Sequence, residues 1–111
     1  PAVEKPVREI LPEELYQWQV TGKLFQFIDV REPDEYERVN LGAELIPLGV
    51  VLDHAPEISL DVPVVIHCKG GTRSAKAIRQ LEKQFGFSNL YNLKGGILAY
   101  IDEIKPELQK Y

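Results

Sequence analysis

The sequence predicts an α/β fold with a central, mainly parallel five-stranded sheet and helices on both faces. Short apolar segments rich in β-branched residues alternate with segments of helical periodicity along the whole chain, which is the pattern of a parallel sheet joined by helical crossovers. Residues 64–66, Val-Val-Ile, include no polar position and are typical of a strand buried on both faces. Residues 74–85 then carry apolar side chains at helical spacing and are followed by Gly86, a common helix C-cap.

Length and composition predict a single domain. The chain has 111 residues and a mass of 12.6 kDa, enough for one sizeable hydrophobic core and too little for two. We expect residues 1–6, which contain two prolines and no periodicity, to form a linker or flexible arm, and residues 7–111 to form the domain. The start at Pro1 and the lack of methionine suggest an excised domain or a processed fragment.

Charge and cysteine content narrow the classes of partner. No apolar run approaches the roughly 20 residues of a membrane helix, so no membrane partner is expected. The net charge of −4 argues against a nucleic-acid partner. The single cysteine, Cys68, cannot form an internal disulfide, which predicts a cytoplasmic protein with a free thiol. Residues 1–67 contain 13 acidic and 5 basic residues, whereas residues 68–111 contain 4 acidic and 8 basic residues. The segment with a net positive charge therefore begins at the cysteine.

The first half of the chain is expected to form three strands and two helices. Each helix begins with a proline followed by acidic residues, Pro12-Glu13-Glu14 and Pro33-Asp34-Glu35. Proline suits the first helical turn because its φ is fixed, and acidic side chains there stabilise the positive end of the helix dipole. The expected strands are residues 7–10, 24–30 and 44–47, and the expected helices run from 12 up to Gly22 and from 33 to 39.

The second half is expected to continue the same alternation. A short helical segment at residues 50–54 leads through a turn into the strand at 64–67. After the helix at about 74–85, residues 90–93 form the last short strand, and a final helix at 97–104 stops near Pro106 because proline cannot continue a helix.

The stretch His67-Cys68-Lys69-Gly70-Gly71-Thr72-Arg73-Ser74 is the strongest candidate site. It joins a buried strand to the start of a helix, so several backbone N–H groups and the positive end of a helix dipole point at Cys68. The two glycines allow the loop to fold into an anion-binding nest, and Lys69 and Arg73 add positive charge. All of these groups favour a thiolate.

Two other stretches are expected at the same edge of the sheet. In open α/β sheets ligands bind beyond the carboxyl ends of the strands. Asp29 lies at the carboxyl end of the strand expected at residues 24–30, and the loop Lys94-Gly95-Gly96 follows the strand at 90–93. Both are therefore expected near Cys68.

The sequence resembles the rhodanese family of sulfurtransferases. The six-residue loop from Cys68 to Arg73, followed by Ser74, is similar to the persulfide loop of that family. Three more segments are similar to family motifs and stand in the expected order within residues 7–104. They are Phe27-Ile28-Asp29-Val30-Arg31-Glu32 with Glu35-Tyr36, Gly42-Ala43-Glu44-Leu45-Ile46-Pro47, and Leu93-Lys94-Gly95-Gly96-Ile97. Residues 38–42, Arg-Val-Asn-Leu-Gly, depart from the more usual Gly-His-Ile element.

The resemblance implies a rhodanese-like three-layer fold and a catalytic Cys68. In this family the cysteine takes the outer sulfur of a donor such as thiosulfate and then passes it to a nucleophile. The substrate-binding residues that the resemblance implies are Lys69, Gly70, Gly71, Thr72, Arg73 and Ser74, whose N–H groups hold the persulfide, while Lys69 and Arg73 also bind the anionic donor.

The resemblance also implies supporting residues around the loop. Asp29 orients the loop or neighbouring arginines, Arg31 pairs with acids in the adjoining helix, and Gly95 and Gly96 form the late glycine loop. No metal and no cofactor are implied, and His54 and His67 lack partner ligands at useful spacing. His67 alternates with Cys68 along the strand, so it is expected to point to the other face.

The end of the chain is similar to rhodanese domains fused behind adenylating enzymes that activate ubiquitin-like sulfur carriers. The similar residues are Gly95-Gly96-Ile97-Leu98-Ala99-Tyr100, Asp102-Glu103-Ile104 and the stretch from Lys105-Pro106 to Lys110-Tyr111. This resemblance implies an upstream adenylating domain and a sulfur-carrier protein as partners. The pathways it implies are molybdenum-cofactor biosynthesis, thiamine biosynthesis and tRNA thiolation.

Two alternative functions remain open from the sequence. A related cysteine phosphatase or arsenate reductase also places a cysteine and an arginine around an anion, but its loop needs one more residue than the four that separate Cys68 from Arg73. A non-catalytic regulatory or docking module could also keep the fold, although a complete, basic cysteine loop argues against it. Nucleotide binding has little support, because residues 70–74 fit no nucleotide-binding fingerprint.

Overall fold

The computed structural model describes residues 6–108 and shows a five-stranded sheet. The strands are β1 (Glu9–Ile10), β2 (Gln26–Asp29), β3 (Glu44–Leu45), β4 (Val64–His67) and β5 (Leu90–Leu93), in the spatial order β1-β5-β4-β2-β3. Every pair of neighbouring strands is parallel, which confirms the predicted sheet. The predicted arm at residues 1–6, apart from Pro6, lies outside the described residues.

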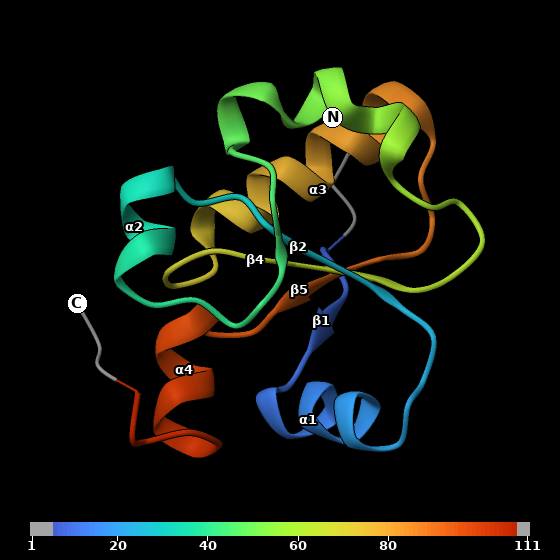
Figure 1. The fold of residues 1–111 in the computed structure, drawn as a ribbon. Coiled ribbons are helices and arrows are strands. Elements are labelled where there is room, and N and C mark those ends of the chain that lie inside the picture. Colours follow the sequence, from blue (N-terminus) through green and yellow to red (C-terminus); the bar gives the residue numbers. More distant parts are fainter. Residues whose placement is uncertain (1–5, 109–111) are drawn as a thin grey trace.

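The helices cover both faces of this sheet, as predicted. They are α1 (Pro12–Val20), α2 (Pro33–Arg38), the 3-10 helix η1 (Leu48–Glu57), α3 (Thr72–Phe85) and α4 (Gly96–Glu103). Figure 1 shows α3 and the green η1 above the strands, with α1 and α4 below them. Of these helices in the described part of the chain, none is long and apolar enough to cross a membrane.

Alternation along the strands sends successive side chains into two separate cores. Ile66 and Cys68 belong to the core under α3 and η1, together with Ile28 of β2. Val65 lies in the other core, with Leu93 of β5 and residues of α1 and α4. The central strand β4 is buried at all four positions: the apolar run at residues 64–66 predicts this burial, and His67 is buried as well.

The proline-plus-acid signals mark both helix starts correctly. Pro12 and Pro33 are each at the first position of a helix. The acid three residues after each N-cap receives a hydrogen bond from the backbone N–H of that N-cap, at 3.0 Å for Glu14 and 3.0 Å for Glu35. These contacts satisfy N–H groups that a helix cannot bond internally.

Helix α3 begins earlier than the periodicity predicts. Its apolar positions indicate a start near residue 74, whereas the helix begins at Thr72, directly after Gly71. Gly71 is the N-cap and has a φ of +109°, a conformation that residues with a side chain rarely adopt. The last residues of the cysteine loop are therefore the first turn of α3.

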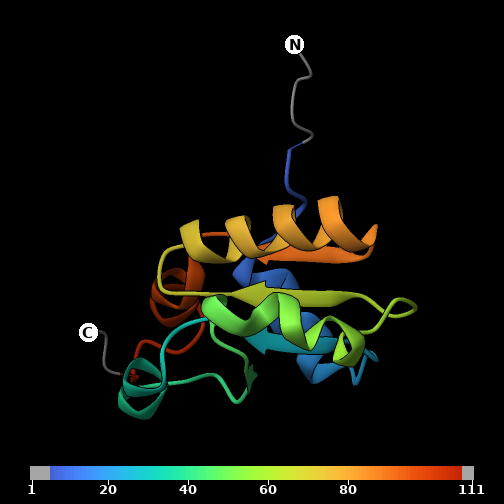
Figure 2. The same ribbon diagram turned by 90° about the horizontal axis from the view of Figure 1, so that it is seen from above.

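The carboxyl ends of the central strands meet at one edge of the sheet. In Figure 2 the arrowheads of teal β2, yellow-green β4 and orange β5 point to the same side. Asp29 at the end of β2 pairs with His67 at the end of β4, and Ile66 pairs with Asn92 of β5. The loops that leave these strands form the candidate site.

Candidate active site

Cys68 directly follows β4 and is almost completely buried, with 1 % of its surface exposed. Its thiol is free. The backbone N–H of Gly71 donates to the Sγ atom at 3.1 Å, and the hydroxyl of Ser74 lies 3.3 Å from the same atom. The loop therefore folds back so that hydrogen-bond donors face the sulfur.

These donors outweigh the effect of burial on the thiol. Burial raises the pKa of Cys68, but the Ser74 hydroxyl and the backbone N–H groups of Ser74, Gly71 and Gly70 lower it, and the resulting pKa lies below the ordinary value of a cysteine. The dipole of α3, which begins at Thr72, acts in the same direction. A thiolate in this position is a nucleophile. The donors that stabilise it also favour any other anionic sulfur held at the same place.

The start of α4 fixes the other side of the loop. The backbone N–H groups of Ile97 and Leu98 donate to the carbonyl oxygens of Cys68 and Lys69, at 2.9 and 3.2 Å. These two carbonyls are thereby held by α4, away from the donor groups that face the sulfur. Gly96 makes the contact possible, because a Cβ atom there would overlap the carbonyl oxygen of Lys69.

Arg73 joins the loop to α2. Its Nη1 and Nη2 atoms donate to the two carboxylate oxygens of Glu35, at 2.6 and 2.9 Å. The same carboxylate caps the first turn of α2 through the Glu32 N–H. Glu35 stands in one of the segments that resemble the rhodanese family, yet the sequence alone does not assign it this contact with Arg73.

The remaining predicted loop residues are less buried than Cys68 and Ser74. Lys69 is half-buried, and Gly70 and Thr72 are exposed. A Cβ atom at Gly70 would meet nothing within 4 Å. This side of the loop is therefore the more exposed one.

Asp29, Arg31 and His67 form a buried polar cluster at the ends of β2 and β4. All three are 0 % exposed, and Arg31 donates to Asp29 through Nε and Nη2, with the Nη2 contact at 2.8 Å. Arg31 also donates to the carbonyl oxygen of Glu35 on α2, at 3.4 Å. Asp29 thus orients a neighbouring arginine, while the loop arginine, Arg73, is oriented by Glu35.

His67 lies on the opposite face of the sheet from Cys68, as the alternation predicts. It packs on Phe27, with ring centroids 5.0 Å apart, and Phe27 belongs to the core on the side of α1 and α4. Its Nε2 atom lies 3.5 Å from Asp29. Desolvation lowers the pKa of His67 to about 4, and this effect exceeds the opposing attraction of Asp29. His67 is therefore neutral at pH 7.

Asn92 is a site residue that the sequence alone assigns only to a strand. Its Oδ1 atom is 2.5 Å from the Ser74 hydroxyl, and its Nδ2 atom donates to the carbonyl oxygen of Gly71 at 3.1 Å. Only 4 % of Asn92 is exposed. The available signal is the amide itself, because a polar side chain inside a buried strand needs hydrogen-bond partners.

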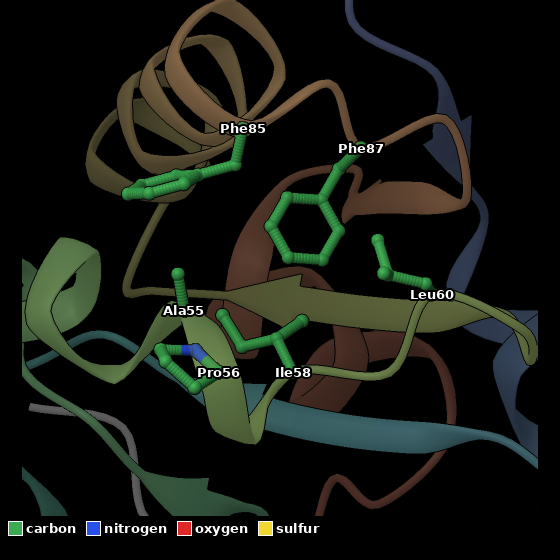
Figure 3. Close-up of a pocket in the computed structure, with 6 residues that line it drawn as sticks. All are labelled: Ala55, Pro56, Ile58, Leu60, Phe85 and Phe87. Atoms are coloured by element: carbon green, nitrogen blue, oxygen red, sulfur yellow. The ribbon is translucent and has the colours of Figure 1, made fainter.

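A separate apolar groove lies at the other end of the sheet. It has a volume of about 260 Å³ and is lined by Ala55, Pro56, Ile58, Leu60, Phe85 and Phe87 (Figure 3). These residues precede β4 and β5 in the chain, so the groove lies at the amino ends of those strands. None of the predicted site residues lines it. Within residues 6–108, no group of three or more His, Cys, Asp or Glu side chains could hold a metal ion.

Comparison with known proteins identifies relatives over most of the chain. The family model of the rhodanese-like domain matches residues 11–103. The probable adenylyltransferase/sulfurtransferase MoeZ of Mycobacterium tuberculosis (strain CDC 1551 / Oshkosh) is 36% identical over 105 residues, which cover 92% of this chain and 26% of MoeZ. The adenylyltransferase and sulfurtransferase UBA4 of Eremothecium gossypii is 45% identical over 105 residues, covering 85% of this chain and 24% of UBA4.

Solved structures agree with these sequence relatives. A rhodanese-like domain protein from Staphylococcus aureus superposes with a TM-score of 0.78 at 31% identity, covering 88% of this chain and 95% of that one. By contrast, the chain spans about a quarter of the length of MoeZ and UBA4. MoeZ and UBA4 therefore share this domain and contain much additional sequence.

Proposed function

The chain belongs to the rhodanese family, and from this premise we propose that it is a sulfurtransferase in which Cys68 carries sulfur as a persulfide. The observation that carries the proposal is the set of backbone donors around the Sγ atom: the N–H of Gly71 at 3.1 Å and the N–H groups at the start of α3. Such donors stabilise a thiolate, and they suit a persulfide anion equally well.

The proposed reaction has two half-reactions. The Cys68 thiolate attacks the outer sulfur of thiosulfate, the S–S bond of the donor breaks, and sulfite leaves with the bonding electron pair. A nucleophile such as cyanide then attacks the terminal sulfur of the persulfide, and the Cys68 thiolate leaves and is regenerated. Sulfur moves from donor to acceptor, and the electrons balance without a separate redox cofactor.

We further propose that the physiological acceptor is a ubiquitin-like sulfur-carrier protein, and that an adenylating domain activates it. The names of MoeZ and UBA4, which combine adenylyltransferase with sulfurtransferase, support this assignment. Residues 7–111 would then act as the sulfur-supplying domain in molybdenum-cofactor, thiamine or tRNA-thiolation chemistry, and the cytoplasm is the proposed compartment.

Substitution of Cys68 by serine tests the proposed function. Cys68→Ser is expected to abolish sulfur transfer from thiosulfate to cyanide, because a serine hydroxyl forms no persulfide, while the thermal unfolding curve stays close to that of the wild type. Mass spectrometry after thiosulfate treatment should show one added sulfur on the Cys68 peptide of the wild type alone. Transfer at the wild-type rate by the variant would refute the proposal.

The wild-type protein also serves to test the two alternative functions, a related cysteine phosphatase or arsenate reductase and a non-catalytic regulatory or docking module. Hydrolysis of an aryl phosphate without persulfide formation would identify a phosphatase. Failure of the wild-type thiol to react with iodoacetamide near neutral pH would identify a non-catalytic module. Both results are contrary to the proposal, which predicts a reactive thiol and no phosphatase turnover.

A further inference from the structure

The hydroxyl group of Ser74 lies between two hydrogen-bond acceptors. Its oxygen is 2.5 Å from Oδ1 of Asn92 and 3.3 Å from Sγ of Cys68. A hydroxyl has only one proton to donate. All three side chains are buried, with exposed fractions of 0 % for Ser74, 4 % for Asn92 and 1 % for Cys68, so water does not readily supply a second proton.

The orientation of the Asn92 amide is fixed by its other contact. The carbonyl oxygen of Gly71 can only accept a hydrogen bond, so the group that faces it at 3.1 Å must be the NH₂ of Asn92. The Oδ1 atom of Asn92 consequently faces Ser74 and can only accept. A contact of 2.5 Å between these two oxygens requires the Ser74 proton to lie between them.

Turning this proton towards the sulfur therefore has a cost. With a thiolate at Cys68, the Ser74 hydroxyl gains a charge-assisted bond, but the Ser74 and Asn92 oxygens are then left facing one another without a proton. With a neutral thiol, the S–H group of Cys68 can donate to the Ser74 oxygen while Ser74 donates to Asn92. The contact between Asn92 and Ser74 therefore favours the neutral thiol of Cys68 over the thiolate, compared with a site in which Ser74 contacts the sulfur alone.

We propose that Asn92 is a positioning residue that competes with the sulfur of Cys68 for the single hydroxyl proton of Ser74. This inference rests on the proposed function only in taking Cys68 as the reacting residue. In the persulfide the negative charge moves to the terminal sulfur, Sγ becomes a weaker acceptor, and the proton stays with Asn92. Asn92 therefore disfavours the free thiolate relative to the persulfide, which favours the loaded form of the enzyme.

The test is a double-mutant cycle on the pKa of Cys68, measured from the pH dependence of alkylation by iodoacetamide. The signal comes from one site, because the chain has one cysteine. In the Asn92→Leu background, Ser74→Ala should raise this pKa by about 1, the effect of losing a hydrogen bond to a charged acceptor. In the wild-type background, Ser74→Ala should raise it by much less.

Asn92→Leu also removes the bond to Gly71, so the informative quantity is the difference between the two pKa changes caused by Ser74→Ala and not the pKa of any single variant. Equal changes in both backgrounds, or a larger change in the wild type, would overturn the proposal. If Asn92→Leu does not fold, as judged by thermal unfolding, Asn92→Ala replaces it in the same cycle, with the same expected difference.

Asn89 offers a matched control. It immediately precedes the same strand, and its Nδ2 donates to the carbonyl oxygens of Ser59 and Val62, at 2.7 and 2.6 Å. The effect of Ser74→Ala on the Cys68 pKa in an Asn89→Leu background should equal the small wild-type effect; a large effect there would also contradict the proposal. Alkylation requires no sulfur donor, so the mutant cycle and the persulfide experiments test different proposals. A negative result in the cycle refutes the role of Asn92 and leaves the persulfide assignment of Cys68 unaffected. Absence of a persulfide refutes the proposed function and leaves the pKa comparison valid.

Discussion

Arg73 has a defined position because Glu35 holds it with two charge-assisted hydrogen bonds. The pair is only partly exposed, at 34 % for Arg73 and 17 % for Glu35. It connects the first turn of α3 to the first turn of α2. A role of Arg73 in binding the anionic donor stays a prediction, and the contact adds a second role, since it fixes where the first turn of α3 lies.

Removal of the Glu35 charge should slow the proposed reaction. Glu35→Gln is expected to reduce the rate of persulfide formation roughly tenfold, because a charge-assisted bond is worth on the order of 1.5–3 kcal/mol and tenfold corresponds to about 1.4 kcal/mol. If the two residues act as a unit, adding Arg73→Ala to Glu35→Gln reduces the rate little further. The measurement is the stopped-flow rate of thiosulfate cleavage for the two single variants and the double variant.

Glu37 provides the control for this experiment. It lies on the same helix and is exposed, so Glu37→Gln removes the same charge without touching Arg73. Its rate should match that of the wild type. Fully additive effects of Glu35→Gln and Arg73→Ala would contradict the idea that the pair acts as one unit.

Two helices converge on the cysteine loop and bind it in different ways. The start of α3 directs N–H groups towards the sulfur, whereas the start of α4 directs its N–H groups towards the carbonyls of Cys68 and Lys69. Gly96 lies at this contact with a φ of +64°. Close approach of α4 to the loop therefore depends on the absence of a side chain at this one position.

Alanine substitution separates the conformational cost of a glycine from its packing role. Gly96→Ala is expected to destabilise the protein and to lower sulfur transfer at least tenfold, because the new Cβ overlaps the Lys69 and Cys68 carbonyls. Gly22 has a similar positive φ of +72°, but a Cβ atom there would meet nothing within 4 Å. Gly22→Ala should therefore lower the stability of the protein by roughly 1 kcal/mol without lowering its activity. Equal transfer rates for the two variants would show that the contact between α4 and the loop does not matter.

Local signals in the sequence account for most of the elements. The proline-plus-acid pairs place the starts of α1 and α2, and the apolar segments place β2, β4 and β5, because these signals depend on neighbours in the chain. The short strands β1 and β3 fall within the expected residues 7–10 and 44–47. The start of α3 is missed by two residues, since residues 72 and 73 carry no apolar side chain and only the backbone of Gly71 marks the helix start.

The candidate site was predictable residue by residue only where it is local, and the meeting of the strand ends predicted that Gly95-Gly96 lies near the loop without predicting its contacts. Cys68 and the N–H groups of Gly70, Gly71 and Ser74 belong to one short loop, so the sequence identifies them together. The contacts of Asn92 and Glu35 join residues from separate elements. Such contacts depend on strand order and helix placement, which periodicity does not specify.

The buried cluster at the strand ends affects the stability of the whole molecule through His67. This histidine is 0 % exposed, and burial lowers its pKa from 6.5 to about 4. Between these two values the unfolded chain binds a proton that the folded protein does not. Folding stability therefore falls as the pH decreases from 6.5 to about 4, and above 6.5 the residue has no such effect.

The pH dependence of unfolding measures this effect. In urea unfolding of the wild type, His67 should lower the free energy of unfolding by up to roughly 3 kcal/mol between pH 6.5 and pH 4. This magnitude follows because a pKa difference of 1 between the folded and unfolded states corresponds to about 1.4 kcal/mol. His67→Phe should show a flatter profile over this range. Identical slopes for wild type and His67→Phe would exclude His67 as the cause.

The anchors of the cysteine loop come late in the chain. Asn92, Ile97 and Leu98 bind the carbonyls of Gly71, Cys68 and Lys69, although all three follow the loop in sequence. A protein leaves the ribosome with its N-terminal part first, so β4 and the loop emerge before β5 and α4. During that interval the cysteine is present without the groups that hold its loop in shape. Under the proposed function, the reactive form of Cys68 is expected only once β5 and α4 have docked, so that the ability to take up sulfur would coincide with the completion of folding.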